Sequence, residues 1–439
     1  MKNVIVIGAG LAGCEAAYQL ANLGFCVKLY EMKKIKRHDA FKTDKFAELI
    51  CSNSLRSDNI ENAVGLLKEE MRCLDSLIME AADATKVDAG SSLAVDRHMF
   101  SDYITAKIYA HPNIEVIDKE ATELDTDIPT LIASGPLTEG TLSEEIGKLC
   151  NNDYLYFYDA VSPIIEKESI DFSKAYYKSR YEDGDGDYIN CPMTKEEFFR
   201  FYHEVINAKC IAVKEMDSEI YFEGCMPFEA MAKRGFNTLL FGPMKPVGLE
   251  KDGKRPFAVV QLRQDNAVKT LYNIVGFQTH LTFGEQKRII SLIPGLENAS
   301  IVRYGVMHRN TYINSPRVLN HHYQFIDQPN IFIAGQISGV EGYIESAASG
   351  LYAALSMAQY LNGNEIVELG SDTMMGAMAN YISDHKIDKL VPMNANFGIF
   401  KCDAKVNKKD KRKEYARIAI DNINSYKERV LCKNSLNNI

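Results

Sequence analysis

The first thirty residues contain the feature that most limits how this chain can fold. Val4–Ile7 is a short β-branched run, typical of a buried central strand, and Gly8-x-Gly10-x-x-Gly13 follows it directly. Helical spacing covers residues 14–23, Gly24 ends that helix, and residues 26–30 form a second strand-like run that closes on Glu31. This order of strand, glycine turn, helix and strand predicts a Rossmann-like dinucleotide-binding domain.

Each part of this motif has a physical task. Gly8 allows the tight turn, Gly10 lets the backbone approach a pyrophosphate, and Gly13 allows close packing of helix on strand. The free N–H groups of the helix N-terminus attract phosphate, and Glu31 can accept hydrogen bonds from a ribose. The predicted cofactor-binding residues of the motif are Gly8, Ala9, Gly10, Leu11, Ala12, Gly13 and Glu31. The pattern alone does not separate FAD from NAD.

Two later segments extend the prediction to a flavin domain. Residues 129–136 and 330–336 are strand-like runs that end in small residues, and the second leads through 338–343 into a helix rich in small residues over 345–360. In glutathione-reductase-like flavoproteins such a helix N-terminus caps the isoalloxazine, so Gly335, Gln336, Gly342 and Tyr343 are further cofactor candidates. The predicted fold is α/β, with a discontinuous FAD-binding domain (1–160 plus 305–439) and an inserted α/β domain (161–304).

Composition narrows the function classes. The 439 residues carry 50 basic and 59 acidic side chains, a net charge of −9, which does not favour a mainly electrostatic nucleic-acid binder. The ten cysteines include no Cys-x-x-Cys pair, so we expect reduced thiols and no metal site. No apolar run reaches the roughly 18 residues of a membrane span. We therefore expect a cytoplasmic protein with no membrane partner.

Several longer strings resemble a known family over almost the whole chain, the folate- and FAD-dependent RNA uracil-5-methyltransferases (TrmFO, formerly Gid). They are the segments 8–16, 48–57, 93–97, 187–193, 223–229, 259–266, 271–279, 303–311 and 335–343. Only the first is shared with flavoproteins in general. The polar residues Arg97, Glu229, Arg263, His308 and Arg309 lie within these strings, and their roles stay open.

The resemblance implies a reaction and a set of small molecules. Carbon 5 of uracil becomes nucleophilic when a thiolate adds to carbon 6, and a base must then remove the carbon-5 proton. The resemblance implies 5,10-methylenetetrahydrofolate as the one-carbon donor, FAD as the carrier of two electrons, and NAD(P)H as the reductant. The sequence contains no second Gly-x-Gly-x-x-Gly, so NAD(P)H is expected to bind transiently over the flavin.

Two cysteines are the catalytic candidates. The resemblance implies Cys225, which precedes Met226-Pro227, as the thiol that adds to uracil, and Cys51 as a supporting thiol that carries a proton. Ser52-Asn53-Ser54 can cap a following helix, which would place Cys51 in a field that favours thiolate. Which of the two is the nucleophile stays open. Cysteines 14, 26, 73, 150 and 210 are expected to be small buried residues.

The RNA target and two other functions also stay open. This chain departs from the family pattern at Asp88, Lys269 and Lys401-Cys402, and the family has paralogues that act on 23S ribosomal RNA, so tRNA and rRNA are both candidate substrates. A general flavin oxidoreductase is one alternative. A flavin-bound RNA-binding protein that uses the basic segment 401–417 is another. The sequence does not predict an oligomeric state.

Overall fold

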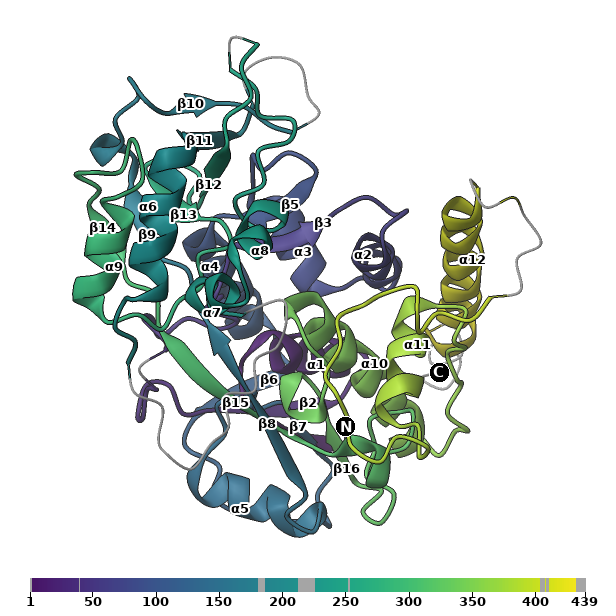
Figure 1. The fold of residues 1–439 in the computed structure, drawn as a ribbon. Coiled ribbons are helices and arrows are strands. Elements are labelled where there is room, and N and C mark those ends of the chain that lie inside the picture. The colour runs from purple at the N-terminus through teal and green to yellow at the C-terminus, as the bar shows by residue number, and fades with distance from the viewer. Residues whose placement is uncertain are drawn as a thin grey trace.

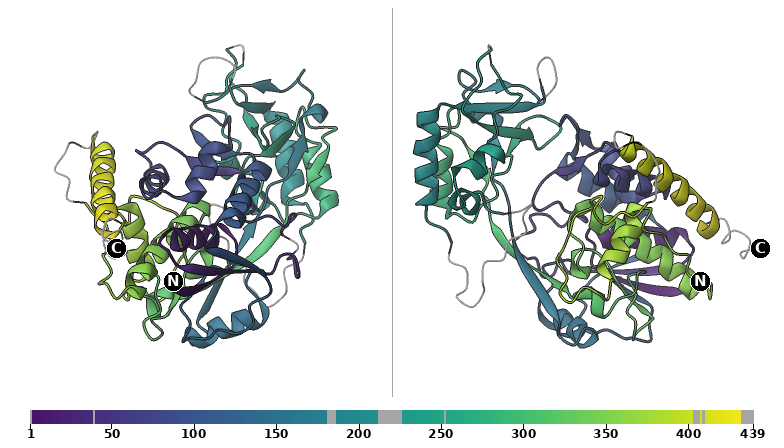
Figure 2. Two further views of the ribbon diagram at one scale, coloured as in Figure 1. Left: turned by 180° about the vertical axis from the view of Figure 1, so that it is seen from behind. Right: turned by 45° about the vertical axis from the view of Figure 1, so that its right-hand side comes forward.

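The structure is a computed structural model, and it describes most of the chain (Figure 1). The described residues are 2–38, 40–180, 186–211, 226–251, 253–402, 407 and 410–431, with the backbone alone at 157–159, 308 and 431. Figures 1 and 2 show two bodies joined by a long two-stranded ribbon.

The first body is built on a parallel sheet. Its strands are β1 (Asn3–Ile7), β2 (Cys26–Glu31), β6 (Ile114–Asp118), β7 (Thr130–Ile132) and β16 (Ile331–Ile333). They lie in the order β16-β7-β1-β2-β6, and every neighbouring pair is parallel. The β-branched run of β1 therefore lies at the centre of the sheet, as expected of a strand covered on both faces. The predicted Rossmann-like α/β fold is confirmed.

Helices from both ends of the chain complete this body. They are α1 (Leu11–Asn22), α2 (Ala63–Cys73), α3 (Leu77–Ala84), α4 (Arg97–Ala110), α5 (Gly140–Leu149), α10 (Tyr343–Leu361), α11 (Met374–Ile382) and α12 (Lys411–Leu431). Helices α1 and α10 touch closely, because a Cβ on Gly350 would lie 2.3 Å from the carbonyl oxygen of Ala12. The first and last thirds of the chain thus share one core.

The second body has its own core around an antiparallel sheet. Its strands, in spatial order, are β10 (Tyr176–Tyr177), β11 (Tyr188–Met193), β12 (Ala258–Gln264), β13 (Leu271–Ile274), β9 (Ile164–Glu166) and β14 (Ile301–Arg303). Its helices are α6 (Lys195–Ile206), α7 (Phe228–Lys233), α8 (Phe236–Phe241) and α9 (Phe283–Ile290). These elements lie between residues 164 and 303. The exact domain boundaries at 160 and 305 stay a prediction.

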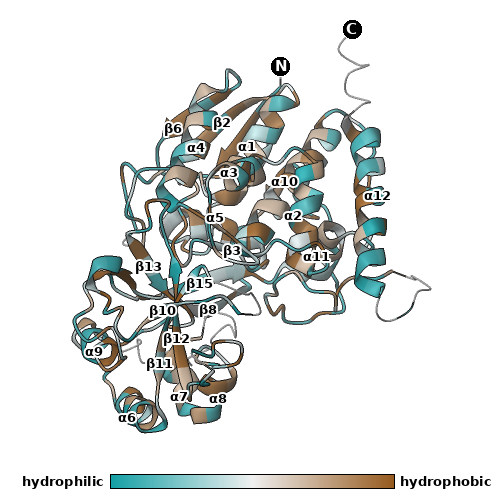
Figure 3. Ribbon diagram, turned by 90° about the horizontal axis from the view of Figure 1, so that it is seen from above, coloured by the Kyte–Doolittle hydropathy of each residue, from teal (hydrophilic) through white to brown (hydrophobic). Residues whose placement is uncertain are grey.

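The remaining elements are the ribbon that joins the two bodies, a small sheet and several short turns. The ribbon pairs β8 (Tyr154–Ala160) with β15 (Met307–Ile313), and a three-stranded sheet joins β3 (Ser54–Ser57), β5 (Ser92–Val95) and β4 (Lys86–Val87). Among the described residues, 3₁₀ turns cover Lys167–Ser169, Ser315–Arg317 and Gln336–Ser338. Figure 3 shows hydrophilic residues along much of α12, the helix that contains the end of the basic segment. In the part of the chain that the structure describes, none of the helices combines the length and apolar character needed to cross a bilayer.

Candidate functional site

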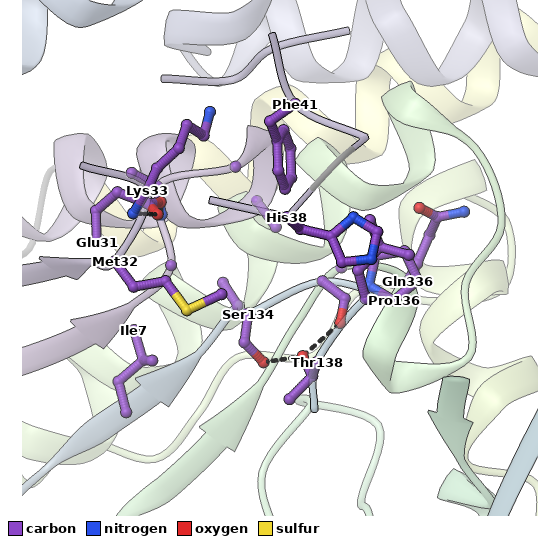
Figure 4. A pocket seen from close by; sticks show the side chains of 18 of the residues that line it. Ile7, Glu31, Met32, Lys33, His38, Phe41, Ser134, Pro136, Thr138 and Gln336 are labelled. Carbon is purple, nitrogen blue, oxygen red and sulfur yellow. Dashed lines mark hydrogen bonds between the residues drawn. The ribbon is translucent and has the colours of Figure 1, made fainter. Parts of the chain in front are cut away.

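A cleft opens where the strands of the parallel sheet end (Figure 4). Four segments line it: the turn after β1, the end of β2, the chain after β7, and the turn between β16 and α10. The predicted residues that line it are Gly8, Ala9, Gly10, Leu11, Ala12, Glu31, Gly335, Gln336 and Tyr343. Ligands of open α/β sheets bind at this edge of the strands.

The glycine turn has the geometry that a pyrophosphate requires. Gly8 has a φ of 97°, and a Cβ on Gly13 would lie 1.8 Å from the carbonyl oxygen of Gly8. A Cβ on Gly10 would meet no atom within 4 Å, so the backbone there is open to the cleft. Helix α1 begins at Leu11, and no side chain among the described residues caps its first turn. The N–H groups of that turn can therefore bind phosphate oxygens.

Glu31 is held in place at the end of β2. Its Oε2 accepts a hydrogen bond from the backbone N–H of Ala9 at 2.8 Å, and its Oε1 accepts one from the N–H of Lys33 at 2.9 Å. A carboxylate has about four lone-pair positions, so further positions can accept ribose hydroxyls. The predicted residues thus fit the adenosine and pyrophosphate parts of FAD.

The turn between β16 and α10 closes the other side of the cleft. Gly335 and Gly342 have φ values of 79° and 114°, and Gly342 precedes the first residue of the 19-residue helix α10. Gln336 lines the cleft while its side-chain amide donates to Glu341 at 2.8 Å. A long helix that begins at a cleft directs positive potential into it, which suits an electron-accepting ring.

A second cavity adjoins the cleft and shares part of its wall. Ile50, Pro136, Leu137, Gln336 and Tyr343 line both spaces. The second cavity also contains several polar groups, namely Cys51, Ser52, Arg56, Arg263, Asn273, Gln278, Asn310, Glu341 and Asn394. Such a mix of donors and acceptors suits a polar heterocycle placed beside a flavin.

Tyr343 links the two spaces. Its hydroxyl oxygen accepts hydrogen bonds from the backbone N–H groups of Cys51 at 2.6 Å and Ser52 at 3.3 Å. Burial, with the nearby Cys51, raises the pKa of Tyr343 above its ordinary value, so its phenol stays protonated. One side chain on helix α10 therefore holds the segment that contains Cys51.

Two arginines attach the same segment to the inserted body. Arg97 forms an ion pair with Asp265 at 3.0 Å and donates to the carbonyl oxygen of Leu49 at 2.6 Å. Arg263 donates to Ser52 Oγ at 2.6 Å. Both arginines are at least nine-tenths buried. The chain on either side of Cys51 is thus tied to both bodies.

The sequence-based position of Cys51 was wrong in one respect. Ser52-Asn53-Ser54 does not begin a helix: Ser54 starts strand β3, and the next helix, α2, begins at Ala63. Strand β3 pairs with β5, and this pairing supplies hydrogen-bond partners to part of this backbone. No helix begins here, so there are no unpaired N–H groups of a first helical turn for a side chain to cap. The half-buried Cys51 therefore lies in a loop that faces the second cavity.

Some predicted residues lie outside the part of the chain that the structure describes. Cys225 falls outside the described residues, as does the side chain of His308. The prediction that the sulfurs of Cys51 and Cys225 meet therefore stays a prediction. Of the cysteines expected to be buried, Cys14 and Cys150 are, whereas the remaining three are only half-buried: Cys26, Cys73 and Cys210.

Sequence reasoning missed part of the cleft. Lys33, His38, Phe41 and Thr138 line it, and Figure 4 labels their side chains among those around the cleft. No motif marks these positions, because they come from loops after β2 and β7. The only sequence signal for Arg263 was its place in one of the family-like strings.

Comparison with known proteins assigns the family. A family model described as "Glucose inhibited division protein A" matches residues 3–365. A protein from Anoxybacillus flavithermus named "Methylenetetrahydrofolate--tRNA-(uracil-5-)-methyltransferase TrmFO" is 58% identical over 428 residues, which are 97% of this chain and 99% of that protein. The chain belongs to the TrmFO/Gid family. The family resemblance of its sequence strings is therefore confirmed.

Other members and a solved structure agree with this assignment. The protein of the same name from Bacillus subtilis (strain 168) is 57% identical over 426 residues, which are 96% of this chain and 98% of that protein. The solved structure of Aquifex aeolicus GidA superposes with a TM-score of 0.68 at 15% identity and covers 98% of this chain and 75% of that one. At that identity the likeness shows the fold alone.

Proposed function

We propose that this chain methylates carbon 5 of a uridine in tRNA, with 5,10-methylenetetrahydrofolate as the one-carbon donor and FAD as its redox cofactor. The observation that carries the proposal is the pair of joined spaces: a dinucleotide cleft that shares Tyr343 with a polar cavity containing Cys51. The curated relatives, 57–58% identical over nearly their whole length, are named for this reaction on tRNA, which favours tRNA over ribosomal RNA.

The residues of the cleft bind and orient the cofactor. The glycine turn and the start of α1 receive the pyrophosphate, and Glu31 receives the ribose. Gly335, Gln336 and Tyr343 form the wall beside the ring, and Gly342 lines the adjoining cavity. Reduced flavin supplies the two electrons that take the transferred carbon from the methylene to the methyl level. NAD(P)H, which reaches the flavin from outside, is the proposed source of those electrons.

The residues of the second cavity act on the substrates. Arg263, Asn273 and Asn310 provide polar groups for the pterin or uracil edges. Cys225 adds to carbon 6 of uracil, and Cys51 takes up the proton released from carbon 5. The sequence similarity supports these two roles. The position of Cys51, half-buried in the second cavity and next to Ile50 of the shared wall, is consistent with its role.

The test compares cysteine variants in one assay. Purified Cys225→Ala, Cys51→Ala and Cys73→Ala are loaded with FAD and supplied with labelled methylenetetrahydrofolate, NADPH and unmodified tRNA. We expect all three to retain flavin, and only Cys73→Ala to form 5-methyluridine, since Cys73 ends helix α2 and is absent from the lining of both spaces. Full methyl transfer by Cys225→Ala would refute the mechanism. Methylation of 23S ribosomal RNA in preference to tRNA would refute the substrate.

A further inference from the structure

Three metal-ligating side chains meet inside the inserted body, apart from the flavin cleft. Cys210, Glu229 and His280 each offer one ligand atom, and these three atoms lie within 4.8 Å of one another. They come from the chain after α6, from helix α7, and from the loop between β13 and α9. We propose that they form a binding site for one borderline-soft divalent cation, of which Zn²⁺ is the best match.

The backbone holds the three segments together. Cys210 pairs with Leu281 in a short antiparallel bridge, and the N–H of Ile211 donates to the carbonyl oxygen of His280 at 2.8 Å. The N–H of Phe228, at the start of α7, donates to the carbonyl oxygen of Gln278 at 2.8 Å. The backbone of residues 278–281 therefore bonds both to the segment of Cys210 and to the start of α7. These backbone contacts, and not only the side chains, bring the three ligands together.

The carboxylate is oriented as metal-binding carboxylates usually are. Glu229 is fully buried, its Oε2 accepts from Thr279 Oγ1 at 2.9 Å, and its Oε1 accepts from the N–H of His280 at 2.8 Å. His280 Nδ1 lies 2.8 Å from the same Oε1. Hydrogen bonds of this kind fix the direction of a ligating group.

The donor set selects the class of metal. Thiolate, imidazole and carboxylate together suit Zn²⁺, whereas Mg²⁺ and Ca²⁺ prefer oxygen ligands alone. Three protein ligands leave a fourth tetrahedral position for water, which is the pattern of open zinc sites. Cys210 is the half-buried member of the group, and the other two are buried.

Cysteine and histidine bind a metal in their deprotonated forms. Binding is therefore best measured in weakly alkaline buffer, at about pH 8.

A second cluster provides a matched control. His321, His322 and Glu368 also place ligand atoms within 4.8 Å of one another. That cluster lies at the surface, where the Glu368 side chain is 65% exposed, and it contains no sulfur. A signal that requires a metal–sulfur bond therefore separates the two.

The experiment titrates the flavin-loaded protein with Co²⁺ and records difference spectra, so that flavin absorption cancels. We expect a sulfur-to-cobalt charge-transfer band that saturates at one Co²⁺ per chain. Cys210→Ser should abolish the band, His280→Gln and Glu229→Gln should weaken binding at least tenfold, and His321→Gln should leave it unchanged. A band that survives in Cys210→Ser would overturn the proposal, as would the absence of any band in the unaltered protein.

A second measurement does not depend on the variants folding. Zn²⁺ added at one equivalent should slow the alkylation of Cys210 by iodoacetamide at least tenfold, as read by peptide mass spectrometry, and a chelator should restore it. Cys73, half-buried on α2 in the other body, is the internal reference and should react at the same rate throughout. Equal alkylation of Cys210 with and without Zn²⁺ would overturn the proposal.

Discussion

Replacing Tyr343 with phenylalanine removes its hydroxyl and keeps its ring. The change therefore separates the hydrogen bonds of the hydroxyl from the role of the ring in lining the two spaces. In Tyr343→Phe the ring still lines the cleft and the second cavity. The backbone N–H groups of Cys51 and Ser52 lose the hydroxyl oxygen that accepts their hydrogen bonds, at 2.6 Å from Cys51 N and 3.3 Å from Ser52 N. We therefore expect FAD to stay bound while the segment that contains Cys51 loses its anchor.

The size of the effect follows from the two hydrogen bonds. A hydrogen bond contributes about 1 kcal/mol net, and a buried group left without a partner costs about 1–3 kcal/mol. The contact at 3.3 Å is the weaker one, so the total should be about 1–3 kcal/mol. At about 1.4 kcal/mol per factor of ten, methyl transfer should fall about 5- to 150-fold.

A second tyrosine with a hydrogen-bonded hydroxyl serves as the control. Tyr312 is buried, and its hydroxyl donates to the carbonyl oxygen of Leu390 at 3.1 Å. Neither of these two residues lines the cleft or the second cavity. Flavin content, urea unfolding and single-turnover methyl transfer are measured for Tyr343→Phe and Tyr312→Phe. Both should lose stability, and only Tyr343→Phe should lose methyl transfer.

Two results would contradict this reasoning. Methyl transfer at the normal rate by flavin-loaded Tyr343→Phe would mean that the hydroxyl does not position Cys51 for the reaction. An equal loss in Tyr312→Phe would mean that reduced stability alone explains the defect.

Three further predictions concern the cofactor and the stability of the fold. Gly13→Ala should abolish FAD absorbance, because its Cβ would lie 1.8 Å from a carbonyl oxygen, whereas Gly284→Ala meets nothing within 4 Å and should keep the flavin. Arg97→Met leaves the carboxylate of Asp265 buried without its partner and should lower the free energy of unfolding in urea by about 3–5 kcal/mol. A milder loss, below about 1 kcal/mol, would show that water reaches this pair. Burial raises the pKa of Glu70 from 4.5 to about 8, so the folded state holds an extra proton and the free energy of unfolding should fall as pH rises from about 4.5 to 8. Glu70→Gln should remove that part of the slope, and an unchanged urea profile across this range would contradict the shift.

Local rules were enough to predict the nucleotide-binding core. The strand, glycine turn, helix and second strand follow one another within residues 3–31, and each depends on neighbours in the sequence. The predicted helix at 345–360 likewise corresponds to α10, whose small residues match its close packing on α1. The same kind of rule failed at Ser52-Asn53-Ser54, where pairing with β5 takes precedence over a local helix cap.

Motif and propensity thus determined by themselves that this chain forms a Rossmann-like flavin fold, and longer strings determined its family. Only the tertiary structure decided which distant residues meet. Cys51 and Tyr343 are 292 positions apart, and Arg97 and Asp265 are 168 apart. Cys210, Glu229 and His280 also meet only because the edge formed by residues 278–281 pairs with two other segments. Such contacts depend on how whole elements pack, and the pattern of residues within any one segment does not contain that information.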